Sequence, residues 1–321
     1  MRIIVTGVRG FIGSVLAKRA TELGHTVYGI DDESRGLNDP SFLGENYFKH
    51  DCLGGILEVF QGQRPKIDAV AHLAALTGEL QRPIDELNLY NVHMMERVYA
   101  DALTLGAKAF VFPTTSLALG VPDSGYVISK EAALKSLLFR DFEKKIAIPL
   151  RFFNVCGSYK GLTEFRKNEV HIVYKVVQAF MEQGLLPPGE NKPFLINGSD
   201  YDTKDGTPSR DFVNVLDVVE YILRLVENKL TGFDPQPASD GATWLGTGKL
   251  TTALDVVNIA EQYLGDLKYT IGPRRSFDCG ALHVDPHQRD LFKHARGGML
   301  IPPHISIRDE IRDLVQLWTL M

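Results

Sequence analysis

Cysteine is scarce in this 321-residue chain, and long hydrophobic runs are missing. Cys52, Cys156 and Cys279 are odd in number and far apart, so they suit neither a disulfide framework nor a metal site. We therefore expect a reducing, cytoplasmic setting. No apolar run reaches the roughly 18 residues that span a bilayer, so we expect no membrane association. The first residues, MRIIVTG, lack a cleavage site and are expected to form a strand rather than a signal peptide.

A surplus of positive charge is also missing. The chain has 35 Lys and Arg against 40 Asp and Glu, a formal net charge of −5. Proteins that bind nucleic acid through its phosphates need a basic excess or a dense basic patch, so we expect no nucleic-acid partner. The nine histidines are dispersed. His283 and His287 stand four residues apart without an evident third ligand, so we expect no metal.

The first half of the chain alternates short apolar runs with amphipathic stretches. Strands are predicted at residues 2–6, 25–30, 46–48, 67–72, 108–113 and 147–153. Helices are predicted at 11–23, 83–104 and 129–144. Near-continuous apolar strands separated by helices indicate a parallel sheet covered on both faces. The expected fold class is therefore α/β, with a doubly wound parallel Rossmann sheet.

The second half has a different pattern. Helical stretches at 168–183, 216–228, 252–264 and 308–320 are separated by polar loops rich in Gly, Pro, Asp and Asn. This predicts a smaller α+β substrate-binding lobe. We expect residues 1–157 to form the first domain, with later strands contributed from the C-terminal half, and residues 158–321 to form the second lobe.

Three glycines, Gly7, Gly10 and Gly13, follow the first predicted strand. A dinucleotide site needs glycine where the chain turns, where amides approach the pyrophosphate and where helix meets strand. The second strand ends in Asp31 and Asp32, about 18 residues after the last glycine. A carboxylate at this place accepts hydrogen bonds from a ribose diol and repels a 2′-phosphate. The arrangement therefore predicts NAD as the cofactor.

Two cations leave a second cofactor open. Arg9 lies inside the glycine loop and Arg35 follows the second predicted strand. Either guanidinium is suited to pair with a 2′-phosphate, so NADP remains the alternative.

Tyr126 and Lys130 stand four residues apart where a helix is expected to begin, so they share one helix face. A tyrosine is a poor base at neutral pH because its reference pKa is about 10. A nearby ammonium and an oxidised nicotinamide both favour the phenolate, and a shift of about three units needs about 4 kcal/mol. The preceding strand ends in Thr114-Thr115-Ser116, where a Thr or Ser hydroxyl can hold a substrate alcohol. We expect Tyr126, Lys130 and one of these hydroxyls to be catalytic.

Together these motifs resemble the extended short-chain dehydrogenase/reductases, and within them the NAD-dependent nucleotide-sugar epimerases of the UDP-glucose (UDP-galactose) 4-epimerase type. The resemblance covers nearly the whole chain. Further segments in the family's order are Asp51-Cys52, His72-Leu-Ala-Ala75 and Leu150-Arg-Phe-Phe-Asn-Val-Cys-Gly157. The most specific match is the stretch 198–217, in which Arg210 precedes Asp-Phe.

The resemblance implies an isomerase that inverts C4 of a UDP-hexose through a transient 4-keto sugar, with NAD retained. The implied cofactor contacts are Gly7, Gly10, Phe11, Ile12, Gly13, Asp31, Asp32, Asp51, Cys52, Leu73, Ala74, Ala75, Asn91, Tyr126, Lys130 and Phe153. The implied substrate contacts are Thr115, Asn154, Asn168, Leu195, Arg210, Arg275, Asp278 and Leu282. The partner is then a UDP-sugar, and a homodimer is expected through the helices at 83–104 and 129–144.

Several positions depart from the family. Ser116 and Leu117 stand where related 4,6-dehydratases carry an Asp-Glu pair, which disfavours elimination chemistry. Thr77 stands where the epimerases commonly carry a Lys near the cofactor diphosphate, so one cationic contact is expected to be missing. Leu282 replaces a Tyr that borders the sugar in many relatives, which suggests room for an N-acetyl group.

Two other functions remain open at this point. An NAD(P)H-dependent reductase of a 4-keto nucleotide sugar would use the same motifs but exchange its cofactor. A non-catalytic NAD-sensing protein would share the fold, although it has no need of a base such as Tyr126. The sugar is also open among a hexose, an N-acetylhexosamine, a pentose and a uronate.

Overall fold

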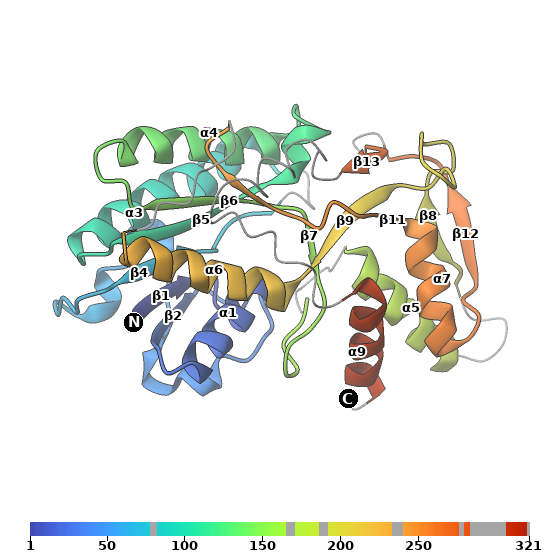
Figure 1. Cartoon of the computed structure of the whole chain (residues 1–321), viewed down its shortest axis with the longest axis horizontal. Coiled ribbons are helices and arrows are strands. Elements are labelled where there is room, and N and C mark those ends of the chain that lie inside the picture. The colour runs from blue at the N-terminus through green and yellow to red at the C-terminus, as the bar shows by residue number, and fades with distance from the viewer. Residues whose placement is uncertain are drawn as a thin grey trace.

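A computed structural model describes residues 1–77, 82–164, 171–185, 192–232, 240–275, 279–282 and 306–319. Figure 1 shows a large sheet flanked by helices, which holds the N-terminus, beside a smaller lobe, which holds the C-terminus. No helix in the described residues combines the length and the apolar character needed to cross a membrane.

The large sheet has seven strands in the order β10-β6-β5-β4-β1-β2-β3, all paired in parallel. Their bounds are β1 Arg2–Thr6, β2 Thr26–Asp31, β3 Tyr47–Lys49, β4 Ala69–His72, β5 Ala109–Thr115, β6 Ala147–Phe152 and β10 Thr243–Leu245. The central strands are buried along their length, as both-face coverage requires. This confirms the predicted doubly wound parallel sheet.

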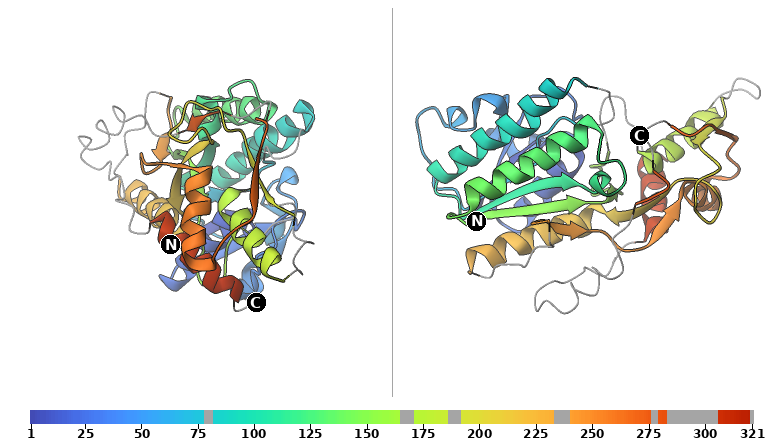
Figure 2. Two further views of the ribbon diagram at one scale, coloured as in Figure 1. Left: turned by 90° about the vertical axis from the view of Figure 1, so that its right-hand side faces the viewer. Right: turned by 90° about the horizontal axis from the view of Figure 1, so that it is seen from above.

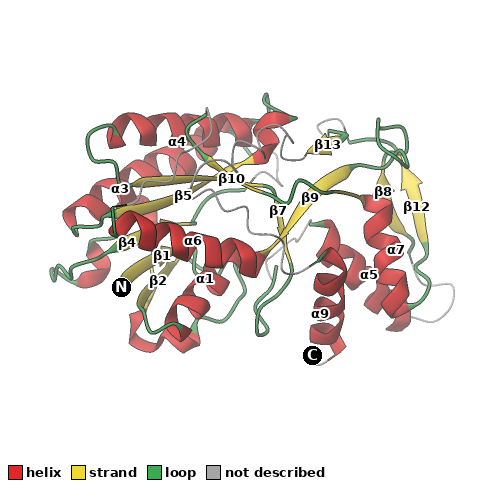
Figure 3. Ribbon diagram, in the orientation of Figure 1, coloured by secondary structure: helices red, strands yellow, loops and turns green. Residues whose placement is uncertain are grey.

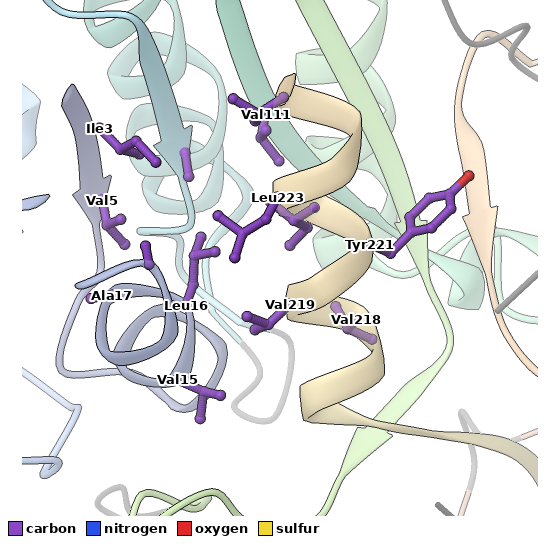
Figure 4. Close-up of a cluster of buried hydrophobic side chains, with 14 of the residues drawn as sticks. Ile3, Val5, Val15, Leu16, Ala17, Val111, Val218, Val219, Tyr221 and Leu223 are labelled. Carbon is purple, nitrogen blue, oxygen red and sulfur yellow. The ribbon is translucent and has the colours of Figure 1, made fainter. Parts of the chain in front are cut away.

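Alternate side chains of each strand feed two separate cores. Ile3 and Val5 point into the core under α1 (Phe11–Glu22) and α6 (Val215–Leu230), whereas Ile4 points into the core under α3 (Met94–Thr104) and α4 (Gly125–Asp141). Figure 4 shows Leu16 of α1 and Leu223 of α6 meeting beside Val5. Full burial of each such side chain stabilises the fold by about 1.5–3 kcal/mol.

The helix predicted at 83–104 is interrupted by a π turn. It consists of α2 (Ile84–Asn88), the π turn Leu89–His93 and α3. Short 3-10 turns occupy Ser41–Asn46, Cys52–Gly54, Glu58–Phe60 and Ser116–Leu119. Seen from above in Figure 2, α3 and α4 lie side by side on one face of the sheet, with α6 on the opposite face.

The smaller lobe contains strands that the sequence pattern did not predict. They are β7 Asn154–Cys156, β8 Phe194–Asn197, β9 Ser209–Asn214, β11 Leu250–Thr252, β12 Tyr269–Gly272 and β13 Ala281–Leu282. One of them, β7, lies within residues 1–157, the range predicted for the first domain. β9 pairs with β7, β11 and β13, and β8 pairs with β12. These strands have two to six residues, too few for a period-of-two pattern to stand out.

Helices close the smaller lobe on one side. They are α5 (Ile172–Leu185), α7 (Ala253–Leu264) and α9 (Ile307–Thr319), which pack on one another in Figure 3. Val176, Val257 and Leu314 form part of their shared core.

Candidate active site

The glycine loop after β1 is built so that only glycine fits. Gly7 has φ +70°, and a Cβ there would lie 2.8 Å from the Ala74 amide nitrogen. A Cβ at Gly13 would lie 2.2 Å from the Gly7 carbonyl oxygen. Gly10 precedes α1 directly, so the first amides of that helix open onto the same loop. The amides of Gly7, Val8, Arg9 and Gly10 donate within the protein, so the amides suited to the diphosphate of a dinucleotide are those of the first turn of α1. We call this glycine loop with the start of α1 the glycine cradle.

The neighbouring predicted contacts lie around this cradle. Phe11 and Ile12 form the first turn of α1 and pack partly against the core. After β4, Leu73 donates its amide to the Thr6 carbonyl at 3.3 Å. Ala74 donates its amide to Thr6 Oγ1 at 3.2 Å, and Ala75 follows it in the same loop. The loop after β4 is thereby held against the end of β1.

Asp31 lies at the end of β2 with both carboxylate oxygens held by backbone amides. Its Oδ2 accepts from the Arg9 amide at 2.9 Å and its Oδ1 from the Glu33 amide at 2.8 Å. Burial raises the pKa of Asp31, and these two hydrogen bonds oppose that shift. Asp32 is exposed, and its Oδ1 accepts from both the amide and the hydroxyl of Ser34. The acidic end of β2 is therefore rigidly placed.

Asp51 and Cys52 follow β3. Asp51 Oδ1 accepts from the Leu53 amide at 2.9 Å and caps the 3-10 turn Cys52–Gly54. Burial raises the pKa of the Cys52 thiol to about 12, so this side chain packs as a small neutral group.

A cation does reach the position near Thr77. Arg35 Nη1 donates to Thr77 Oγ1 at 2.7 Å, from the loop after β2. That loop lies directly on the glycine loop, because a Cβ at Gly36 would be 2.4 Å from the Arg9 carbonyl. The sequence suggested that a cationic contact was missing here, and in space Arg35 stands beside Thr77.

Asn91 occupies the π turn and bridges two elements. Its Oδ1 accepts from the Leu76 amide at 2.9 Å, and its Nδ2 donates to the Leu76 carbonyl at 3.0 Å and to Ser129 Oγ at 2.9 Å. The π turn thus aims this amide at the loop after β4 and at α4 together. Sequence reasoning predicted Asn91 as a cofactor contact; the structure places it as a buried brace beneath the proposed site.

Helix α4 begins at Gly125, which confirms that a helix starts at the Tyr126 motif and is four residues earlier than the start of the predicted range 129–144. Ser124 caps it, accepting from the Val127 amide at 3.2 Å. Tyr126 therefore lies half-buried in the first turn, and Lys130 lies one turn further with 2% of its surface exposed. The Lys130 ammonium nitrogen is 4.3 Å from the centre of the Phe112 ring. Burial lowers the pKa of Lys130 to about 7.

Thr115 ends β5 and caps the 3-10 turn Ser116–Leu119. Its Oγ1 accepts from the Leu117 amide at 3.2 Å. The hydroxyl hydrogen of Thr115 is thus directed away from that amide, as a hydroxyl that donates to a substrate oxygen requires.

A buried arginine that the sequence reading treated only as part of a motif supports this corner. Arg151 of β6 is 2% exposed, and its Nη1 donates to the Thr115 carbonyl at 2.5 Å and to Glu131 Oε1 at 2.9 Å. Its Nε donates to Asp240 Oδ2 at 2.8 Å. A charged residue inside an apolar central strand needs buried partners, and that anomaly was the available signal.

The predicted substrate residues of the smaller lobe gather on adjacent strands. Asn154 of β7 pairs with Phe212 of β9, and Leu282 of β13 pairs with Arg210 of β9. Arg210 Nη1 donates to the carbonyls of Ser209, at 2.8 Å, and Cys279, at 3.1 Å. One small sheet therefore brings three segments far apart in sequence to one place.

Leu282 does not border open space. It is 2% exposed, and a Cβ at Gly120 would lie 2.9 Å from its Cδ2. The side chain thus packs on the loop that follows Thr115, so the extra room suggested for an N-acetyl group is not found in the described residues. Leu282 instead joins the two lobes beside the candidate catalytic corner.

The remaining predicted residues are more dispersed. Arg275 is exposed and faces the side-chain amide of Asn197 at 3.0 and 3.2 Å. Leu195 of β8 is half-exposed and lies against Gly272 of β12. Phe153 is buried against Trp244. Asn168 and Asp278 lie outside the described residues. No group of three or more potential metal ligands occurs in the part of the chain that the structure describes.

Comparison with known proteins gives consistent results. The model of the NAD dependent epimerase/dehydratase family matches residues 3–237. The UDP-glucose 4-epimerase of Lactobacillus helveticus is 28% identical over 305 residues, covering 89% of this chain and 88% of that protein. The probable UDP-arabinose 4-epimerase 3 of Arabidopsis thaliana is 26% identical over 328 residues, covering 92% and 77%.

A solved structure has the same fold. It is the UDP-glucose 4-epimerase from Bifidobacterium longum in complex with NAD+ and UDP, with a TM-score of 0.79 and 23% identity. The match covers 100% of this chain and 98% of that chain.

Proposed function

The chain belongs to the NAD dependent epimerase/dehydratase family, and from that premise we propose that it interconverts the C4 epimers of a UDP-hexose through a transient 4-keto sugar. The substrate pair is of the UDP-galactose and UDP-glucose type. The proposal rests on one observation: Tyr126 and Lys130 occupy the first turns of α4, and α4 contacts the last residues of β5, the strand that ends in Thr115. Thr114 Oγ1 donates to Glu131 Oε1 at 3.1 Å, and Lys130 Nζ lies 4.3 Å from the centre of the Phe112 ring.

In this proposal, Tyr126 and Thr115 carry out the proton transfer at O4 of the sugar. When bound, the dinucleotide supplies a reversible two-electron oxidation at a sugar carbon. Tyr126 removes the proton from O4 in one direction and returns it in the other, while the Thr115 hydroxyl orients O4. Lys130 holds a ribose hydroxyl of the dinucleotide and, when protonated, favours the phenolate. Because the proton and the electrons both return to the sugar, the reaction has no net redox change.

The two lobes share the binding work in this proposal. Residues 1–157, completed by α6 and β10, hold the dinucleotide through the glycine cradle and Asp31. Residues 158–321 hold the nucleotide sugar, with Arg210 and Arg275 on its diphosphate, because a guanidinium binds phosphate oxygens in pairs. The relatives' names support UDP as the nucleotide.

The direct test uses enzyme as purified, without added cofactor. Incubated with UDP-galactose, it should form UDP-glucose, detected by chromatography. Tyr126→Phe should lower kcat at least about a hundredfold, the usual contribution of a general base. Tyr263→Phe, on α7 in the smaller lobe, is the matched control.

Two outcomes would contradict the proposal. Turnover that requires added NADH and consumes it would indicate a reductase. A loss below tenfold in Tyr126→Phe would show that another group moves the proton.

We also propose that the chain forms a homodimer through α4 and its neighbours. Phe139 on α4 and Phe142, which follows its last residue, are 86% and 79% exposed, and Ile128 on the same helix is half-exposed. Two exposed phenylalanines side by side at the end of a surface helix favour burial against a partner. Replacing both phenylalanines with serine should convert a dimer to a monomer in light scattering, whereas Ile271→Ser on β12 should not.

We propose a cytoplasmic setting as well. Cys52, Cys156 and Cys279 are all free thiols, which a reducing compartment maintains. A thiol titration of denatured protein, purified from the cytoplasm without reductant, should find three reactive groups.

A further inference from the structure

One carboxylate at the acidic end of β2 holds two cations and a phenol. Glu33 Oε1 lies 3.2 Å from Arg9 Nη1 and accepts from the Tyr47 hydroxyl at 2.9 Å. Its Oε2 lies 2.7 Å from Lys49 Nζ. Arg9 and Lys49, two of the cations near the end of β2, are therefore already paired within the protein.

The arrangement is built onto Asp31, the carboxylate proposed to receive the ribose diol. The amides of Arg9 and Glu33 both donate to Asp31, so the backbones of the two paired residues are fixed by the same group. Glu33 has φ +61°, a left-handed conformation that a side chain other than glycine adopts only when its surroundings hold it there. The pair Arg9–Glu33 is thus a fixed part of the ribose end.

The side-chain charges at the end of β2 determine whether NAD or NADP binds there. A 2′-phosphate needs a guanidinium or ammonium that is available to it, since Asp31 itself repels the phosphate. Arg9 lies in the glycine loop, beside the end of β2. Arg35, the other candidate guanidinium, donates Nη1 to Thr77 Oγ1, on the side of the loop after β4. With Glu33 present, Arg9 and Lys49 are ion-paired and the end of β2 carries additional negative charge.

We propose that Glu33 is a specificity-determining residue: by ion-pairing Arg9 and Lys49 it withholds both cations from a 2′-phosphate and makes the chain select NAD over NADP. The inference deepens the proposed function at its dinucleotide site and depends on that site alone. Removal of the Glu33 carboxylate releases Arg9 and Lys49, so NADP should gain affinity while NAD keeps its own contacts with Asp31.

The test compares dinucleotide affinities rather than turnover. Protein freed of cofactor is titrated with NAD+ and with NADP+ by calorimetry, for the natural chain and for Glu33→Gln. We expect the ratio of the two dissociation constants to fall at least tenfold in the variant, through tighter binding of NADP+. NAD+ affinity should change by less than about threefold. Glu58→Gln, an exposed residue away from the cluster, should leave the ratio unchanged.

A triple variant separates specificity from a merely structural role. When Glu33→Gln is combined with both Arg9→Met and Lys49→Met, the gain in NADP+ affinity should disappear. If the loss of Glu33 only loosened the loop, both dinucleotides would weaken together and the ratio would stay constant, which would overturn the proposal. Glu33→Asn, whose short side chain suits φ +61°, provides the same test if the Gln variant does not fold.

This outcome is distinguishable from failure of the proposed function. An unchanged dinucleotide ratio with intact epimerisation of UDP-galactose rejects only the role of Glu33. A shifted ratio in a protein that acts on no UDP-sugar rejects only the substrate.

Discussion

The proposed dinucleotide end of the large sheet and the proposed nucleotide-sugar region of the smaller lobe are assembled in different ways. In the first region, backbone segments approach so closely that a Cβ atom would not fit between them. Gly13 lies against the backbone of Gly7, and Gly36 lies against the backbone of Arg9. At the second, β7, β9 and β13 bring Asn154, Arg210 and Leu282 together by strand pairing. In the first region, steric exclusion restricts Gly7, Gly13 and Gly36 to glycine. In the second region, strand pairing determines the positions of the residues but not their types. The first region should therefore tolerate far less change.

The sharpest contrast is between two glycines. Gly13→Ala would place a Cβ 2.2 Å from the Gly7 carbonyl, so we expect loss of bound dinucleotide or of the folded protein. Gly184→Ala, in α5 of the smaller lobe, meets no atom within 4 Å and should be neutral or stabilise by about 0.5–1 kcal/mol. Thermal melting and absorbance of released cofactor measure both. Comparable damage from the two changes would remove the contrast.

Two arginines give the next largest difference. Arg151→Met leaves Glu131 and Asp240 without their buried partner and should cost about 3–5 kcal/mol of unfolding free energy. Arg210→Met loses hydrogen bonds to backbone carbonyls and should cost about 1 kcal/mol.

Ligand binding should reverse that order. Arg210→Met should weaken UDP binding at least tenfold, whereas Arg151→Met should lower kcat more than UDP affinity because Arg151 holds Thr115. Arg151→Lys should restore part of kcat. Urea unfolding, calorimetry with UDP and steady-state kinetics measure these effects, and equal changes in both variants would contradict the assignment.

The buried Lys130 should lower the unfolding free energy although activity requires it. Its pKa of about 7 lies below the ordinary value near 10.4, so between these pH values the unfolded chain binds more protons than the native one. Stability should therefore rise with pH across this window.

Lys130→Met should remove that slope. In cofactor-free protein we expect it to raise the unfolding free energy by on the order of a few kcal/mol at pH 6, with the gain fading towards pH 10. Activity should be lost at every pH. Lys135→Met, exposed on the same helix, is the control in urea unfolding at several pH values. A gain independent of pH would show that the cost of Lys130 is not one of ionisation.

The smallest expected effects are at two helix caps. Thr252 caps α7 in a reciprocal box with Asp255, and Thr252→Ala should cost about 1–2 kcal/mol without altering kcat. Ser124 caps α4 alone, and Ser124→Ala should cost about 0.5–1 kcal/mol. Because Tyr126 follows two residues later, kcat should also fall. Thermal melting measures the loss of stability, and steady-state kinetics measure kcat. If kcat is unchanged in both variants, packing rather than the Ser124 cap fixes the start of α4.

The same contrast explains what could be predicted from sequence. Gly7, Gly13 and Asp31 were identified because steric and charge requirements restrict those positions to few residue types. The apolar runs of β1 and β5 revealed the parallel sheet because strands buried on both faces have little alternative composition. These features are local, and a local pattern suffices to find them.

What could not be predicted depends on contacts between distant segments. The π turn that aims Asn91 at Ser129 has no marker in its own residues. The burial of Leu282 against Gly120 joins positions 162 residues apart, so a pattern around either one could not show it. Arg35 beside Thr77 is a further case, because the loop after β2 folds onto the glycine loop.

Helix α6 and strand β10 complete the large sheet from the second half of the chain, and this order affects folding during synthesis. Residues 1–157 emerge from the ribosome before residues 158–321. One face of their sheet then lacks α6 and its edge lacks β10, which end at residues 230 and 245. Translation at about 5–20 residues per second adds the 88 residues from 158 to 245 in roughly 4–18 s. Throughout that interval Val5, Leu16 and Val111 have no Leu223 to cover them. The nascent half-protein therefore exposes apolar surface, which makes such species prone to aggregation.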